Sequence, residues 1–251
     1  MIPSAMLVDI KEEGYIDLHA HVLCGLDDGP STMEESLEVV AGMSDMGYSA
    51  IFATPHQRRD LYAPLPERII EGAARLRENL RLDGSTMKIF SGAENCWDEL
   101  LFERSKKNEI VTYEGTKTFL LEMDGFFLPG ELSRQLFKWR KAGYLPVIAH
   151  LERYINTPNL LERAGEMAET ACFTCNLETL GGAGGRRGVR VAREAVSQGI
   201  ARVLCSDIHG KAWLKHTAKG LRWVRRNLPK GSDELLLRSN PLRVLSGEVP
   251  V

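Results

Sequence analysis

Two histidines stand one residue apart in the stretch "DLHAHVLCGLDDGP", where paired aspartates follow them just before a Gly-Pro turn. Residues i and i+2 of a strand point to the same face, so His19 and His21 could grip a metal ion together. The turn would let Asp28 reach back toward them. The stretch "CSDIH" repeats the spacing with Asp207 and His209. Both stretches therefore indicate metal-ligand chemistry.

Other ionisable side chains follow short apolar runs. His56 comes after "AIFAT", Glu94 after "KIFSG", Glu122 closes "TFLLE", and His150 closes "LPVIAH". The carboxyl ends of parallel barrel strands share one rim, so we expect these side chains to converge there. Five of the six histidines fall at such positions; His216, in a helical pattern, is expected at the surface.

This set of ligands favours certain metals. Imidazole nitrogen and carboxylate oxygen without a thiolate set suit Zn, Fe, Mn or Ni, and several carboxylates favour Mn or Fe. The candidates exceed what one ion needs, so we expect two or three divalent ions, Mn being favoured and Fe, Co or Zn being alternatives.

Covalent catalysis has little support in the sequence. There is no GxSxG elbow and no GxxxxGK[ST] loop. Cys172 and Cys175 form a CxxC without a second such pair, and their strand-like surroundings predict small buried side chains. Metal-activated water is the most economical nucleophile.

The chain alternates short apolar runs with helical patterns, which favours a parallel sheet. We predict one domain over residues 1–251, an α/β distorted (β/α)7 TIM-like barrel, with a doubly wound open sheet as the alternative. Seven runs are expected as strands: "YIDLH", "AIFAT", "KIFSG", "TFLLE", "LPVIAH", "ACFTCNL" and "ARVLCSD". Helices are expected in "STMEESLEVVAGMSDMG", "LPERIIEGAARLRENLRLDG", "PGELSRQLFKWRKAG", "NLLERAGEMAET", "GVRVAREAVSQG" and "AWLKHTAKGLRWVRRNL".

Composition excludes several classes of protein. The net charge of −2 gives no electrostatic attraction to nucleic acid. No apolar run reaches the roughly 18 residues that a membrane span needs, and the start lacks a signal-peptide core. We therefore expect a cytoplasmic protein. The stretch Gly181–Gly188 is expected as a flexible loop whose Arg186 and Arg187 could cover the site, although a plain connector is the favoured interpretation.

The motifs "DLHAH", "ATPH", "GAE", "VIAHLERY" and "SDIH", in this order, resemble the polymerase and histidinol phosphatase (PHP) superfamily. That superfamily uses a distorted seven-stranded barrel with two or three metal ions. "HAHVLCGLDDGPSTMEES" and "PVIAHLERY" resemble the bacterial PHP-type protein-tyrosine phosphatases that act with capsule and exopolysaccharide tyrosine kinases. The resemblance runs from about Ile16 to Pro241.

The resemblance implies a role for each motif residue. One ion would be held by His19, His21, Glu94 and Asp207; a second by Glu94, Glu122 and His150; a third by Asp28, His56 and His209. Arg153, in "HLERY", would bind the phosphate, with Asp207 and His209 beside it in the catalytic set.

The sequence departs from the family pattern in two places. The first fourteen residues are a longer lead-in than is usual. "GKAWLKH" after His209 lacks an arginine that members often carry, so a second phosphate-binding cation is left open between Lys211, Arg58 and Arg59.

The expected reaction is hydrolysis of phosphotyrosine on the tail of an autophosphorylated bacterial tyrosine kinase, without nucleic acid or membrane insertion and with a homo-oligomer left open. A phenolate, with a pKa of about 10, leaves without a strong general acid, and none is evident. Alternatives are a histidinol-phosphatase-like enzyme, a metal-dependent amidohydrolase and a regulatory barrel that binds a kinase tail.

Overall fold

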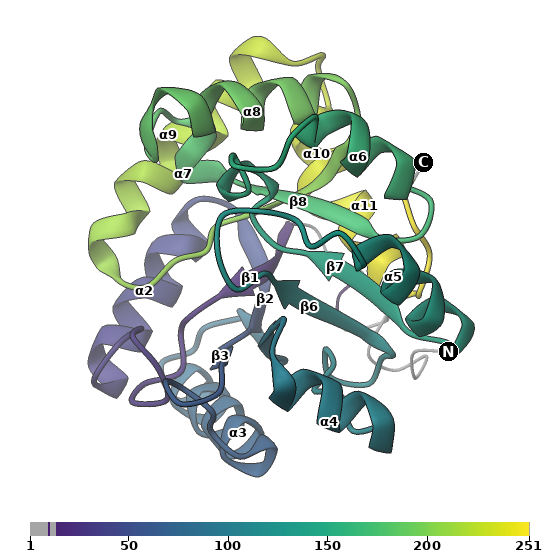
Figure 1. The fold of residues 1–251 in the computed structure, drawn as a ribbon. Coiled ribbons are helices and arrows are strands. Elements are labelled where there is room, and N and C mark those ends of the chain that lie inside the picture. The colour runs from purple at the N-terminus through teal and green to yellow at the C-terminus, as the bar shows by residue number, and fades with distance from the viewer. Residues whose placement is uncertain (1–9, 11–13, 251) are drawn as a thin grey trace.

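The computed structural model describes residue 10 and residues 14–250. The unusual lead-in falls largely outside the described residues. Parallel strands occupy the middle of the molecule and helices surround them (Figure 1). The strands are β1 (Tyr15–Ala20), β2 (Tyr48–Ala53), β3 (His56–Gln57), β4 (Lys88–Ser91), β5 (Glu94–Cys96), β6 (Thr118–Glu122), β7 (Leu145–Ile148), β8 (Cys172–Asn176) and β9 (Ala201–Cys205).

All seven expected strands are present, and two of them, β2 and β4, are followed after a short break by further strands, β3 and β5, that were not expected. The described strands form a three-stranded parallel sheet, β1-β2-β4, and a six-stranded parallel sheet, β3-β5-β6-β7-β8-β9. The breaks fall at Thr54-Pro55 and at Gly92-Ala93. Pro55 has no N–H for a strand ladder. A Cβ on Gly92 would lie 3.0 Å from the Tyr113 ring, so the chain is tightly packed at the second break.

The architecture is mixed α/β with parallel sheets, and no continuous strand ladder closes the described sheets into a barrel. The two ends of the strand order nevertheless meet. Ala20 forms an isolated parallel bridge with Ile208, and the backbone N–H of Asp207 donates to His19 O at 2.9 Å. The carboxyl end of β9 therefore lies beside that of β1.

The six expected helices are confirmed. Thr32 and Glu35 make the capping box of the first, as one of two predicted pairs. The helices are α2 (Met33–Asp45), α3 (Pro66–Leu82), α4 (Glu99–Lys107), α5 (Leu132–Lys141), η1 (Leu151–Arg153), α6 (Leu160–Met167), α7 (Leu177–Leu180), α8 (Gly185–Ser197), α9 (Lys211–Asn227), α10 (Ser232–Glu234), η2 (Leu235–Ser239, a π-helix) and α11 (Asn240–Leu245).

The glycine-rich stretch differs from its prediction. Instead of one flexible loop, it contains the C-cap residue of α7, a short turn and the first turn of α8. Gly184 and Gly185 have φ of +80° and +82°, a left-handed conformation that favours glycine. Arg186 and Arg187 lie on the helix rather than in a loop.

Apolar side chains fill two buried regions. One lies among the strands and includes Ile16, Leu18, Phe52, Val147 and Val203. The larger one lies between the strands and the helices. Cys172 belongs to the inner region and Cys175 to the outer one, and both are buried and free. The prediction that this CxxC consists of buried side chains is confirmed. Packing on both faces of the strands gives the polar residues at their ends a rigid base.

Candidate metal centre

Nine predicted ligand residues meet at the carboxyl ends of the strands. Side-chain atoms of His, Asp and Glu form four groups in which all candidate ligand atoms lie within 4.8 Å of one another. The groups are His21, Asp28, His56 and His209; His19, His21 and Asp207; His19, Glu94 and His150; and His56, Glu94 and Glu122. Shared members join these groups into one continuous cluster, here called the metal centre.

Glu94 lies in the middle of the metal centre. It begins β5 and is 1% exposed. Its Oε1 lies 2.8 Å from His150 Nε2 and 3.3 Å from His19 Nε2. Its Oε2 lies 2.9 Å from His56 Nδ1 and 3.4 Å from His21 Nε2. One carboxylate therefore faces four imidazoles, as a bridging ligand would.

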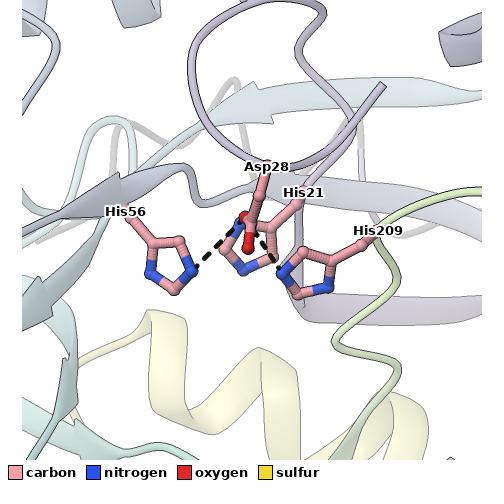
Figure 2. Close-up of side chains that lie close together, drawn as sticks. All are labelled: His21, Asp28, His56 and His209. Carbon is pink, nitrogen blue, oxygen red and sulfur yellow. Dashed lines mark ion pairs between the residues drawn. The ribbon is translucent and has the colours of Figure 1, made fainter. Parts of the chain in front are cut away.

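Asp28 joins the outer part of the metal centre. Its Oδ1 lies 3.6 Å from His56 Nε2 and 3.4 Å from His209 Nε2, and its side chain is 49% exposed. Figure 2 shows the Asp28 carboxylate between these two rings, with His21 beside them. The rings of His21 and His209 stack with centroids 4.0 Å apart. This group is the one most open to solvent.

Two ligand candidates have backbone conformations that regular strands lack. His150 has a φ of +33° and Asp207 has a φ of +51°. These left-handed residues lie beyond the ends of β7 and β9, where the chain turns out of the sheet. Asp207 faces His19 Nε2 at 3.3 Å, whereas His209 faces Asp28. Asp207 Oδ1 and His209 Nδ1 nevertheless lie 3.7 Å apart, so both side chains face the metal centre, through a left-handed turn at Asp207 and not through the expected strand spacing.

Side chains behind the ligands orient the imidazoles. Asp27 Oδ2 lies 2.6 Å from His21 Nδ1 and also accepts the His56 backbone N–H at 3.1 Å. Asn176 Nδ2 donates to Asp207 Oδ2 at 2.7 Å. Partners of this kind fix the ring so that its other nitrogen faces the metal. Sequence reasoning missed Asp27 and Asn176; the paired aspartates of "DDGP" were the only signal, and they identified Asp28.

Without cations, the carboxylates of the metal centre raise the pKa of two of its imidazoles. Burial lowers the pKa of His21, but hydrogen bonds with Asp27 and Glu94 outweigh it and raise the pKa to about 10. Burial likewise opposes protonation of His56, yet Glu122 and Glu94 raise its pKa to about 11. The carboxylates therefore hold protons on these imidazoles. Divalent cations would replace those protons, so their binding should release protons.

Several buried ligand atoms lack a hydrogen-bond partner among the described residues. They are His56 Nδ1, Glu94 Oε2 and Glu122 Oε1; the histidine nitrogen lies 2.9 and 3.5 Å from the two carboxylate oxygens but makes no hydrogen bond with them. In addition, His19 Nε2 and His21 Nε2 face each other at 3.2 Å. Buried polar atoms are normally paired, so orphans gathered at one place indicate a missing partner. Nitrogen and oxygen atoms in this arrangement fit divalent cations.

A cavity of about 460 Å³ opens over one side of the metal centre. Glu122 and His150 line it on the inside, and Arg58 and Arg153 line it nearer the solvent. Arg153 follows His150 on η1, and its guanidinium lies 3.3 Å from Asp207 Oδ2. Two cations and the candidate metal ligands therefore border one cavity, where an anionic ligand would be stabilised.

The remaining predicted residues lie away from this cavity. Arg59 Nη1 lies 3.2 Å from Glu99, and Lys211 Nζ lies 3.2 Å from Glu38. His216 lies on α9 and belongs to no candidate metal group among the described residues. No helix within the described part of the chain has both the length and the apolar character to cross a bilayer.

The chain resembles several known proteins. Its residues 15–246 match the family described as "Capsular polysaccharide synthesis, CpsB/CapC". Tyrosine-protein phosphatase CpsB of Streptococcus pneumoniae is 30% identical over 159 residues, 63% of this chain and 65% of that protein. Tyrosine-protein phosphatase YwqE of Bacillus subtilis (strain 168) is 26% identical over 241 residues, 90% of this chain and 93% of that protein.

The fold of this chain is also similar to that of solved structures. A chain from the study of YwqE and CpsB, described as unique metal-dependent tyrosine phosphatases, has a TM-score of 0.84 at 23% identity, covering 94% of this chain and 96% of that chain. Histidinol phosphate phosphatase from Lactococcus lactis has a TM-score of 0.53 at 12% identity, covering 85% and 93%. The match to streptococcal CpsB spans 65% of that protein's length. From the extent of the family match, the chain belongs to the CpsB/CapC family of capsular polysaccharide synthesis.

Proposed function

We propose that this protein is a metal-dependent phosphatase that hydrolyses phosphotyrosine on the tail of a bacterial tyrosine kinase. The observation that carries the proposal is the cavity that Glu122 and His150 share with Arg58 and Arg153. Two guanidinium groups that would bind the phosphate line this cavity together with candidate metal ligands, and phosphoryl transfer uses such an arrangement. The names of the CpsB and YwqE relatives, both tyrosine-protein phosphatases, support the same substrate class.

The metal centre would hold two or three divalent cations, with Mn favoured by its share of carboxylates. Its residues would be His19, His21, Asp28, His56, Glu94, Glu122, His150, Asp207 and His209. When bound, such cations supply Lewis-acid activation of water and of phosphoryl oxygens. Glu94 would be shared between neighbouring ions, because it contacts imidazoles on both sides.

Arg153 would bind the phosphoryl group. Burial lowers the pKa of its guanidinium, but the charges of Asp207 and Glu94 outweigh burial and raise it, so the group stays protonated. Its planar fork can donate two parallel hydrogen bonds to phosphoryl oxygens, which a lysine ammonium cannot do. Contact with Asp207 fixes its position before substrate arrives.

Arg58 would be the second phosphate-binding cation. It lines the cavity and pairs with Asp124 Oδ1 at 2.5 Å, whereas Arg59 pairs with Glu99 outside it. Arg58→Ala should therefore lower kcat/KM for a phosphotyrosine peptide by about tenfold, the value of one exposed charged hydrogen bond. Arg59→Ala, its neighbour and matched control, should stay within about twofold of the unmodified protein. Equal losses in both variants, measured by phosphate release, would remove Arg58 from this role.

The leaving group of a phosphotyrosine substrate also favours the proposed reaction. A tyrosine phenolate, with a pKa of about 10, departs without full protonation, so the reaction depends less on a general acid than alkyl phosphate hydrolysis does. The proposal includes a cytoplasmic location, no nucleic-acid or membrane partner, and an oligomeric state that is left open.

We also infer that residues 1–251 act as one domain in which the two parallel sheets form a single distorted (β/α)7 barrel. The bridge between Ala20 and Ile208 supports this, because it joins the two ends of the strand order. The alignment with the YwqE and CpsB fold over 94% of the chain supports it as well.

Metal removal tests the proposed function. Protein stripped with a chelator should lose hydrolysis of a phosphotyrosine peptide by at least about a hundredfold, because a bound cation contributes several kcal/mol to the transition state. Re-addition of Mn should restore it. Metal content is measured by mass spectrometry and secondary structure by circular dichroism on the same samples. Unchanged hydrolysis by folded protein that holds less than about a tenth of an ion per chain would contradict the proposal.

A further inference from the structure

The loop between β6 and α5 exposes two neighbouring phenylalanines. Phe126 is 61% exposed and Phe127 is 53% exposed. Leaving two adjacent aromatic rings in contact with water is unfavourable compared with burying them. Such rings beside a polar cavity are typical of a surface that contacts a ligand.

The backbone of this loop is held in place on both sides. The carbonyl of Phe126 accepts the Asn156 backbone N–H at 2.9 Å, and the Leu128 N–H donates to Thr157 Oγ1 at 2.7 Å. Asp124, at the start of the loop, pairs with Arg58. The backbone position of Phe126 is therefore fixed before any ligand binds, so ordering of the loop costs little entropy on binding.

Only one of the two phenylalanines borders the cavity. Phe126 lines it together with Met123 and Gly125, and Phe127 does not. Glu122 and His150 line the same cavity and are buried, at 6% and 1% exposure. A ligand with its phosphate against the arginines and the metal centre would therefore have its next atoms beside Phe126.

We propose that Phe126 determines specificity by packing against the phenyl ring of the phosphorylated tyrosine. The inference rests on the proposed function, since it presumes a phosphotyrosine phosphate at the metal centre. Aromatic rings attract one another in offset or edge-to-face arrangements, beyond the area that they bury. Phosphoserine carries its phosphate on a single carbon and has no ring to meet Phe126.

Two other aromatic side chains near the metal centre, one exposed and one partly buried, lie beside its outer group of His21, Asp28, His56 and His209. The Trp213 ring is 5.9 Å from that of His209, and the Tyr62 ring is 6.0 Å from that of His56. Neither lines the cavity between Arg58 and Arg153. Phe126 is thus the exposed aromatic residue of this cavity, and Trp213 marks the alternative position for a substrate ring.

The test compares kcat/KM for one peptide sequence phosphorylated on tyrosine or on serine, with Mn-loaded protein. Phe126→Ala should lower the value for the phosphotyrosine peptide by about tenfold, mainly through KM, and leave the phosphoserine value within about twofold. Phe126→Tyr should keep the preference, because an aromatic ring remains. Phe127→Ala is the matched control and should keep it too.

Three results would overturn the inference. The first is an unchanged tyrosine-to-serine ratio in Phe126→Ala. The second is an equal loss in Phe127→Ala, which would indicate a general effect of the loop. The third is a loss of preference in Trp213→Ala alone, which would place the substrate ring near His209. Failure of the unmodified protein to hydrolyse the phosphotyrosine peptide would instead refute the proposed function, and the specificity of Phe126 would fall with it.

Discussion

Replacing Glu94 by glutamine is expected to lower kcat/KM for a phosphotyrosine peptide by about a thousandfold, or about 4 kcal/mol of transition-state stabilisation. The amide keeps the size of the side chain but removes the negative charge that faces four imidazoles, at 2.8, 2.9, 3.3 and 3.4 Å. Neighbouring cations would lose their shared ligand. Metal content should therefore fall together with activity, as measured by mass spectrometry and phosphate release.

Glu114→Gln is the control for this experiment. The Glu114 carboxylate accepts hydrogen bonds from Ser91 and pairs with Arg77, outside the metal centre. This variant should keep both its metal ions and its activity. An active Glu94→Gln protein with a full set of ions would show that Glu94 is not a metal ligand.

The second large effect is expected at Arg153. Arg153→Lys should lose about 2–4 kcal/mol of transition-state stabilisation, the cost of removing a preorganised donor. Lysine keeps the charge but cannot donate two parallel hydrogen bonds to one phosphoryl group. Metal content should be unchanged, because Arg153 is not among the candidate ligands. This separates its effect from that of Glu94→Gln.

The comparison uses kcat/KM for a phosphotyrosine peptide at equal metal loading. Arg81→Lys, on an exposed arginine of α3 that pairs with Glu78, is the control and should match the unmodified protein. Near-normal activity of a fully metal-loaded Arg153→Lys protein would exclude Arg153 from phosphate binding.

Much of the metal centre could be predicted from the sequence because its residues directly follow the expected strands. Residues such as His56, Glu94 and Glu122 follow apolar runs, and parallel strands bring their carboxyl ends to one rim. The capping box of α2 was predictable for a similar reason, since Thr32 and Glu35 interact within one turn. Short-range rules of this kind need no knowledge of distant contacts.

Other features depend on contacts that no local pattern reveals. Asp27 orients His21 only because the loop folds back on β1, and two adjacent aspartates look alike in the sequence. Arg58 and Arg59 are also neighbours, yet only Arg58 faces the cavity. The choice between them is made by acidic partners far along the chain, Asp124 and Glu99.

Sequence patterns also did not predict every strand or every helix. The short strands β3 and β5 were not expected; they follow β2 and β4 after breaks at Pro55, which has no N–H for the ladder, and at the tightly packed Gly92. Helix α4 escaped prediction because it is short and buries a single side chain, Leu101, so its periodicity is weak. These local departures change strand pairing but leave the strand ends on one side.

The most direct measurement is kcat/KM for a phosphotyrosine peptide, a phosphoserine peptide and histidinol phosphate, at equal Mn loading. We predict the highest value for the phosphotyrosine peptide, since the cavity joins the metal centre to two arginines and an exposed aromatic ring. The phenolate leaving group adds to this preference. A hundredfold advantage for histidinol phosphate, about 2.7 kcal/mol of transition-state preference, would contradict it and assign the cavity to a small molecule.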